Sequence, residues 1–180
     1  MKHYIIVLMA AVASLLAISS CSNNENRISE HDIALSDSKI EDVVKAHFDE
    51  QNWKYHMYTD EDSIITFEIG FTVDNDKLDV RVCIDPDDLY QIICNTKTEL
   101  PPAVMDKGII AMNDYNVSSR VVSGCVTPKG KIVFWIGRNI DGNAFSEQAF
   151  AADFAMVLQE TEDATSKIFK QIYATSGPDK

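Results

Sequence analysis

The chain has 180 residues, 46% of them hydrophobic, and a formal net charge of −12 at pH 7. This length suits a single domain with enough apolar material for a core. The negative charge repels nucleic acid and anionic lipid headgroups, which argues against DNA, RNA and acidic lipid surfaces as partners of the folded part.

The N-terminus is typical of a secretory signal. Lys2 gives it a positive start, and residues 4–18 contain no charged side chain. This apolar run is too short to span a bilayer comfortably, because a spanning helix needs about 20 apolar residues. The small residues Ser19 and Ser20 follow, and then Cys21. An ordinary secretory signal with an incidental cysteine is the alternative, but the order of these features favours cleavage directly before the cysteine.

Residues 18–21, Ile-Ser-Ser-Cys, resemble the lipobox of bacterial lipoproteins. The resemblance implies that Cys21 receives a diacylglyceryl group, that the signal peptide (residues 1–20) is cut between Ser20 and Cys21, and that the new amine is acylated. Several acyl chains, at about 0.8 kcal/mol per buried methylene, give a stable anchor. The membrane is therefore an expected partner through palmitate-type chains on Cys21. Ser22 stands where an inner-membrane retention signal commonly has aspartate, so we expect the outer membrane of the cell envelope, facing the periplasm.

The pattern of polar and apolar residues divides the rest of the chain into three segments. Residues 21–37 are polar and without periodicity after the cysteine, which predicts a flexible tether. Residues 38–175 contain all the periodic runs and are expected to form one folded domain. Residues 176–180 are expected to be a disordered tail.

The first helix is predicted over residues 38–52. Ser38 and Glu41 have the spacing of a capping box, in which each end bonds the backbone of the other. Apolar residues recur at helical spacing behind them; they are Ile40, Val43, Val44 and Phe48.

Four strands are predicted next. Within the run 63–73, apolar and polar side chains alternate strictly from Ile65 to Val73, as in a half-buried antiparallel strand. Residues 53–59, 78–84 and 89–96 show similar runs, separated from one another by short polar turns. Short polar turns between strands predict an antiparallel meander.

The second half predicts a helix, a hairpin and a long helix. Pro101 and Pro102 suit the first turn of a helix that continues to Tyr115. Residues 119–127 and 131–137 are β-rich runs on either side of a Pro-Lys-Gly turn. The long helix over residues 146–173 is expected to be capped by Ser146, with Phe145 and Phe150 closing a hydrophobic staple. In the preceding helix, Val104, Gly108, Met112 and Tyr115 fall on one helical stripe, and Ile109 and Ala111 flank it.

The element order α-β-β-β-β-α-β-β-α predicts an α+β domain. We expect an antiparallel sheet of about six strands with the helices packed on it. The stripe of the long helix is expected to be the face that packs on the sheet. That stripe consists of Phe150, Phe154, Val157, Leu158, Thr161, Thr165, Ile168, Phe169 and Ile172.

Motifs of enzyme chemistry are absent from the sequence. There is no G-x-S-x-G, H-E-x-x-H, P-loop or G-x-G-x-x-G. His31, His47 and His56 have no partner at ligand or triad spacing; His47 is expected to be a packing residue and His56 to face solvent. We therefore predict no catalytic, cofactor-binding or metal-binding residue, and a protein that is not an enzyme.

Carboxylates cluster in three predicted turns, at residues 60–62, 74–79 and 85–88. The middle cluster begins like a calcium loop, but Leu78 stands at the fifth position and there is no glycine at the sixth. We interpret the clusters as solvated turns, and binding of a cation there is the less favoured alternative.

Cys83, Cys94 and Cys125 each lie inside an apolar, strand-like run. A redox pair or a metal site is disfavoured, because there is no C-x-x-C and no histidine lies near any of the three in sequence. We expect all three to be buried, structural cysteines.

Residues 100–159 resemble the YbjN domain family, whose members are described as bacterial sensory-transduction regulators. The resemblance lies in a helix that ends near Asn113 after apolar residues, a hairpin, and the Ser146-capped helix with its phenylalanines. It covers roughly residues 38–173 and implies the type III secretion chaperone-like fold. That fold implies binding, since such chaperones hold extended segments of a client, partly by adding strands to sheet edges. The lipoprotein signal sets this chain apart from members without one, which would work in the cytoplasm.

Two functions from different classes follow. The first is a non-enzymatic, lipid-anchored module of the cell envelope that binds or senses a protein partner, or pairs with itself as a homodimer; it predicts an exposed apolar patch or an open sheet edge. The second is a small-ligand or cation-binding protein, or a hydrolase, that uses the acidic turns. It predicts an enclosed pocket lined by at least two of those carboxylates.

Overall fold

The computed structural model describes residues 40–174, except 74–75, 87–88 and 140–144. The predicted signal peptide, Cys21, the tether with His31, the Ser38 cap and the tail therefore lie outside the described residues. The elements are α3 (Ile40–Glu50), β1 (Tyr55–Thr59), β2 (Ile65–Val73), β3 (Asp76–Ile84), β4 (Leu89–Glu99), the 3-10 turn η2 (Pro102–Val104), α4 (Met105–Ser118), β5 (Ser123–Val126), β6 (Lys131–Asn139) and α5 (Glu147–Ala174). Their order confirms the predicted α+β class.

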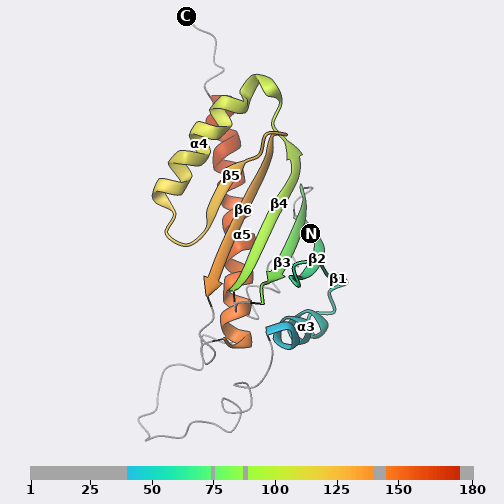
Figure 1. Ribbon diagram of the computed structural model, residues 1–180. Coiled ribbons are helices and arrows are strands. Elements are labelled where there is room, and N and C mark those ends of the chain that lie inside the picture. Colours follow the sequence, from blue (N-terminus) through green and yellow to red (C-terminus); the bar gives the residue numbers. More distant parts are fainter. Residues whose placement is uncertain (1–39, 74–75, 87–88, 140–144, 175–180) are drawn as a thin grey trace, which may run out of the picture. The chain divides into compact units, whose positions relative to one another are not determined.

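The six strands form one antiparallel sheet in the order β1-β2-β3-β4-β6-β5 (Figure 1). The first four are the predicted meander, joined by short turns. The predicted hairpin is added with β6 beside β4, so that β5 lies at one edge of the sheet and β1 at the other. The chain crosses from β4 to this hairpin through η2 and α4.

The core lies between one face of the sheet and the helices. Phe67, Val82, Ile92 and Ile136 stand opposite one another across β2, β3, β4 and β6, and all four are at most 2% exposed. In Figure 1, α5 runs along the sheet behind β4 and β6. Phe48 brings α3 to the same face, since its ring contacts those of Phe67 and Phe154. Tyr115 brings α4 to this face as well, since its ring lies 5.3 Å from that of the buried Phe134. The three helices of the described residues therefore pack on one face of the sheet, and strand alternation aims the other set of side chains away from this core.

The start of α5 has the predicted caps. The Ser146 hydroxyl oxygen accepts a hydrogen bond of 3.1 Å from the Ala149 amide. The rings of Phe145 and Phe150 lie 6.2 Å apart, which closes the staple. The predicted apolar stripe is the face that packs on the sheet; its fully buried members include Phe150, Phe154, Val157, Thr161 and Ile172.

The histidine predictions are confirmed. His47 is buried among aromatic rings, the closest being that of Phe150 at 5.4 Å. Burial lowers the pKa of His47, and the nearby Glu50 carboxylate offsets this in part. His56 is exposed on β1.

The prediction of three buried cysteines is wrong for two of them. Cys94 is fully buried on the core side of β4, where burial raises the pKa of its thiol to about 11. Cys83 is half-buried and Cys125 is exposed. The cause is strand alternation, because Val82 and Gly124 take the inward positions and turn their neighbours to the opposite face.

Candidate functional site

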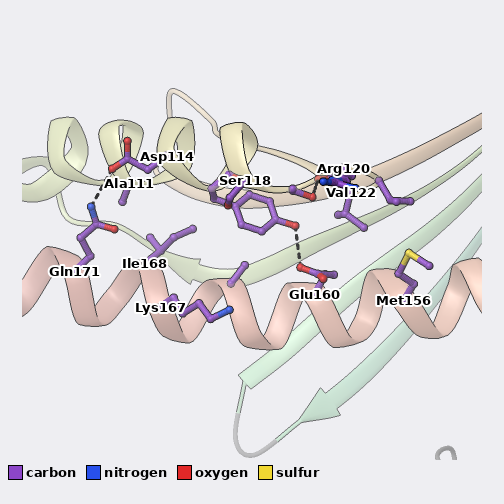
Figure 2. Close-up of a pocket in the computed structure, with 14 residues that line it drawn as sticks. Ala111, Asp114, Ser118, Arg120, Val122, Met156, Glu160, Lys167, Ile168 and Gln171 are labelled. Atoms are coloured by element: carbon purple, nitrogen blue, oxygen red, sulfur yellow. Dashed lines mark hydrogen bonds between the residues drawn. The ribbon is translucent and has the colours of Figure 1, made fainter.

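A groove of about 520 Å³ lies between α4, the segment 119–122 that follows it, and α5 (Figure 2). Its floor is apolar and buried, and consists of Ala111, Val122, Ala164 and Ile168. Its rim is exposed and consists of Asp114, Arg120, Val121, Lys167 and Gln171. The name α4–α5 groove is used below for this set.

Local hydrogen bonds fix the wall of the groove where α4 ends. The Ser119 amide donates to the Tyr115 carbonyl at 2.8 Å, which completes the last turn. The Ser119 hydroxyl then donates to the Val122 carbonyl at 2.6 Å, so that the segment 119–122 folds back toward β5. Because the chain leaves the helix here, Val121 and Val122 lie at the groove.

Two hydrogen bonds cross the groove from helix to helix. The Tyr115 hydroxyl donates to Glu160 at 3.3 Å, and the Gln171 amide donates to Asp114 at 3.2 Å (Figure 2). Both are long for their type, and the Gln171–Asp114 bond is exposed, so a bound segment can replace it at small cost. Burial is the main cause that raises the pKa of Tyr115, with the Glu160 carboxylate adding to it. The hydroxyl therefore remains a neutral donor at pH 7.

The rim carries charges of both signs. Arg120 and Lys167 are cations and Asp114 is an anion, and the half-buried Glu160 adds a second carboxylate to the lining, on a chain whose net charge is −12. An apolar floor with a mixed-charge rim is the usual arrangement of a protein-binding patch, in which the floor supplies affinity and the rim supplies orientation.

Apolar side chains are exposed beside this groove. Ile110 and Val117 on α4 are 59% and 89% exposed, and Val121 at the rim is 42% exposed. Ile109, which flanks the predicted stripe, is 41% exposed. The buried stripe of α4 centres on Gly108, Ala111 and Met112, and Ile109 lies outside it. Three of these exposed apolar residues are thus on α4, and Val121 follows it.

One edge of the sheet is closed by a side chain. The side-chain Nδ2 of Asn116 donates to the Gly124 carbonyl, and its Oδ1 accepts from the Gly124 backbone amide, both at 2.8 Å. The side chain thus bonds β5 as a neighbouring strand would. Gly124 lacks a side chain where a Cβ atom would lie 2.5 Å from the Met112 sulfur, so α4 can approach closely enough for this pairing. No local pattern in the sequence indicates this closure, because it joins two elements through one side-chain amide.

Described carboxylates of the acidic turns are engaged in local contacts, and Asp74, Asp87 and Asp88 lie outside the described residues. Asp60 accepts hydrogen bonds of 3.0 Å from the amides of Asp62 and Ile64 and so closes its own turn, and Asp79 pairs with Lys97 at 3.0 Å. Of the described carboxylates in these turns, Asp79 lines a second cavity of about 540 Å³ on the other sheet face, and none lines the α4–α5 groove. Among the described residues, no group of three or more His, Cys, Asp or Glu side chains could hold a metal ion.

A buried polar cluster was not predicted. Asp153 on α5 accepts a short hydrogen bond from the Tyr90 hydroxyl and two, at 3.0 and 2.8 Å, from Arg138. Burial raises the pKa of Tyr90, and Asp153 adds to the effect. In the sequence, the one clue to this cluster was that Asp153 directly precedes Phe154 of the buried stripe. In the structure, Asp153 is only 7% exposed. The cluster ties β4, β6 and α5 together and satisfies its own polar groups, so we interpret it as structural.

Comparison with known proteins yields structural similarity only. No protein-family model matches the chain, and no curated protein matches it. The crystal structure of YbjN from E. coli, described as a proposed transcription regulator, is similar with a TM-score of 0.45 at 13% identity, covering 77% of this chain and 93% of that chain. A protein from Methanothermobacter thermautotrophicus is similar with a TM-score of 0.47 at 14% identity, covering 76% and 99%. Membership of the YbjN domain family stays a prediction.

None of the described helices combines the length and the apolar character needed to cross a bilayer.

Proposed function

We propose that this chain is a non-enzymatic, lipid-anchored protein of the bacterial cell envelope whose domain binds a segment of another protein in the α4–α5 groove. The observation that carries the binding role is the apolar floor of the groove, flanked by a rim of both charges and by exposed apolar residues of α4. The anchor rests on the lipobox-like residues 18–21.

The groove indicates the chemistry of the bound segment. Small apolar side chains fit over Ala111 and Ala164, which leave the floor open between the two helices. Polar groups of the segment can take over the hydrogen bonds that Asp114 and Gln171 now make to each other. We therefore expect an amphipathic segment with one or two apolar anchors between charged residues. The volume also falls within the range of small-ligand sites, so the test must separate a protein from a small molecule.

Charge reversal at the rim tests the groove without touching its floor. Arg120 and Lys167 are exposed, so the double variant Arg120→Glu/Lys167→Glu should fold normally. Cells with intact envelopes are crosslinked, and the partners are identified by mass spectrometry. The double variant should recover roughly tenfold less of the protein partner, which corresponds to about 1.4 kcal/mol of binding free energy.

The matched control changes the same charge elsewhere. Lys77 on β3 and Lys129 in the β5–β6 turn are exposed and do not line the groove. Lys77→Glu/Lys129→Glu should leave partner recovery unchanged. Equal recovery from both double variants, or no protein partner for the unmodified chain, would contradict the proposed function; the latter result would favour a small ligand.

A further inference from the structure

The β1 edge of the sheet is unlike the β5 edge, because no described residue pairs with it. β1 ends the strand order, and four of its five residues are exposed. Met57 at this edge is 38% exposed. An open strand edge is a template for another strand.

The alternation of hydrogen-bonded pairs along β1 and β2 shows which backbone groups of β1 face away from the sheet. The Asp60 amide donates to the Ile64 carbonyl in the same register as the β1–β2 ladder, in which Tyr58 is opposite Thr66 and Met57 is opposite Phe67. In an antiparallel ladder hydrogen-bonded and non-hydrogen-bonded pairs alternate. Even-numbered residues therefore bond β2, and the backbone groups of Tyr55, Met57 and Thr59 point away from the sheet.

We propose that this edge pairs with β1 of a second copy of the chain, antiparallel, about a two-fold axis at Met57. This register places Tyr55 opposite Thr59 of the second copy and Met57 opposite its own counterpart. All three outward-facing residues then form hydrogen-bonded pairs at once. Shifting the register by two residues in either direction would leave one of them without a partner from the strand.

Charge and side-chain chemistry select the same register. Lys54 comes opposite Asp60 of the second copy on both sides of the axis, so two pairs of opposite charge flank the strand pair. Lys54 is exposed and has no ion pair within the described chain. His56 comes opposite Tyr58 of the second copy, and the rings of these two residues already lie 5.6 Å apart within one chain. Cross-strand pairs of these kinds are stabilising. The contact is self-complementary, as a two-fold interface must be.

A disulfide trap tests both the pairing and its register. The paired strand is short, so the dimer is expected to be weak and is best captured covalently. In a hydrogen-bonded pair the two Cα atoms lie about 5.5 Å apart, within the range that a disulfide spans. Met57→Cys in the full chain, with Cys125→Ala to remove the exposed native thiol, should form a disulfide dimer under mild oxidation in the envelope. Ile110→Cys is the matched control, since Ile110 is an exposed apolar residue on α4.

The expected result is roughly tenfold more disulfide dimer from Met57→Cys than from Ile110→Cys, because only the former meets the distance requirement of a disulfide. Thr59→Pro, which removes an outward-facing amide without touching the bonds to β2, should abolish the dimer in the Met57→Cys chain. Equal yields from the two cysteine variants would overturn the proposal. So would a Tyr55→Cys chain that crosslinks to itself as well as Met57→Cys does, because the register would then differ. The outcome is independent of the α4–α5 groove, which lies on other elements.

Discussion

Replacing Phe154 with alanine should lower the free energy of unfolding by about 3–5 kcal/mol. Phe154 on α5 is 1% exposed, and its ring lies 5.5 Å from that of Phe48 on α3, 5.4 Å from Trp53 and 5.9 Å from Phe71 on β2. Phe154 therefore joins α5, α3 and the meander in one aromatic cluster. The change leaves a cavity where three elements meet, and none of them can move in without losing its other contacts.

Urea unfolding followed by circular dichroism measures this loss. Phe169→Ala is the matched control, because Phe169 is on the same helix but only half-buried, with its ring stacked 6.1 Å from that of Tyr173. The control should lose about 1–2 kcal/mol, less than half as much, since less apolar area is buried there. Equal losses would show that the core does not centre on the α3–α5 cluster.

Replacing Cys21 with alanine should abolish lipid attachment altogether. If Cys21 is the acylated residue, the variant has no thiol to modify, and residues 1–20 are then not cut off. Cells grown with labelled palmitate should incorporate label into the unmodified protein and none into the variant, which should also migrate as the longer chain. Losing several acyl chains removes an anchor worth about 0.8 kcal/mol per methylene, so the change in membrane attachment should be large.

Cys125→Ala is the control for this experiment. Cys125 is the exposed cysteine of the folded domain, so it is the other thiol that a modifying enzyme could reach among the described residues. This variant should keep the full label and the short chain. Label retained in Cys21→Ala, or a Cys21→Ala chain cut at the same position, would contradict the lipid anchor and leave an ordinary secretory signal.

Periodicity and helix caps in the sequence predicted which strand faces pack on the core and where α5 begins. Alternation over residues 63–73 and 78–84 marks which side chains of β2 and β3 face the core, and Ser146 with Phe145 marks the start of α5. These signals are local, because each depends on residues a few positions apart. They were sufficient for the fold class and for most of the core.

What the sequence missed depends on contacts between distant residues. Apolar runs alone could not show that Cys125 stands on the outer face of an edge strand, since Cys94 and Cys125 both lie inside strand-like runs. The pairing of Asn116 with Gly124, and of Asp153 with Tyr90 and Arg138, each requires the elements to be in place first. The α4–α5 groove arises in the same way, from two helices that are separated by a hairpin.

The proposed function is tested most directly by a photocrosslinking residue placed at Val121 in cells with intact envelopes. Val121 is exposed at the rim of the groove, whereas Thr72 is exposed on the sheet and serves as the control position. We predict a covalent adduct with one other protein from Val121 and no such adduct from Thr72. The same set of adducts from both positions, or none from Val121, would contradict a partner bound in the groove.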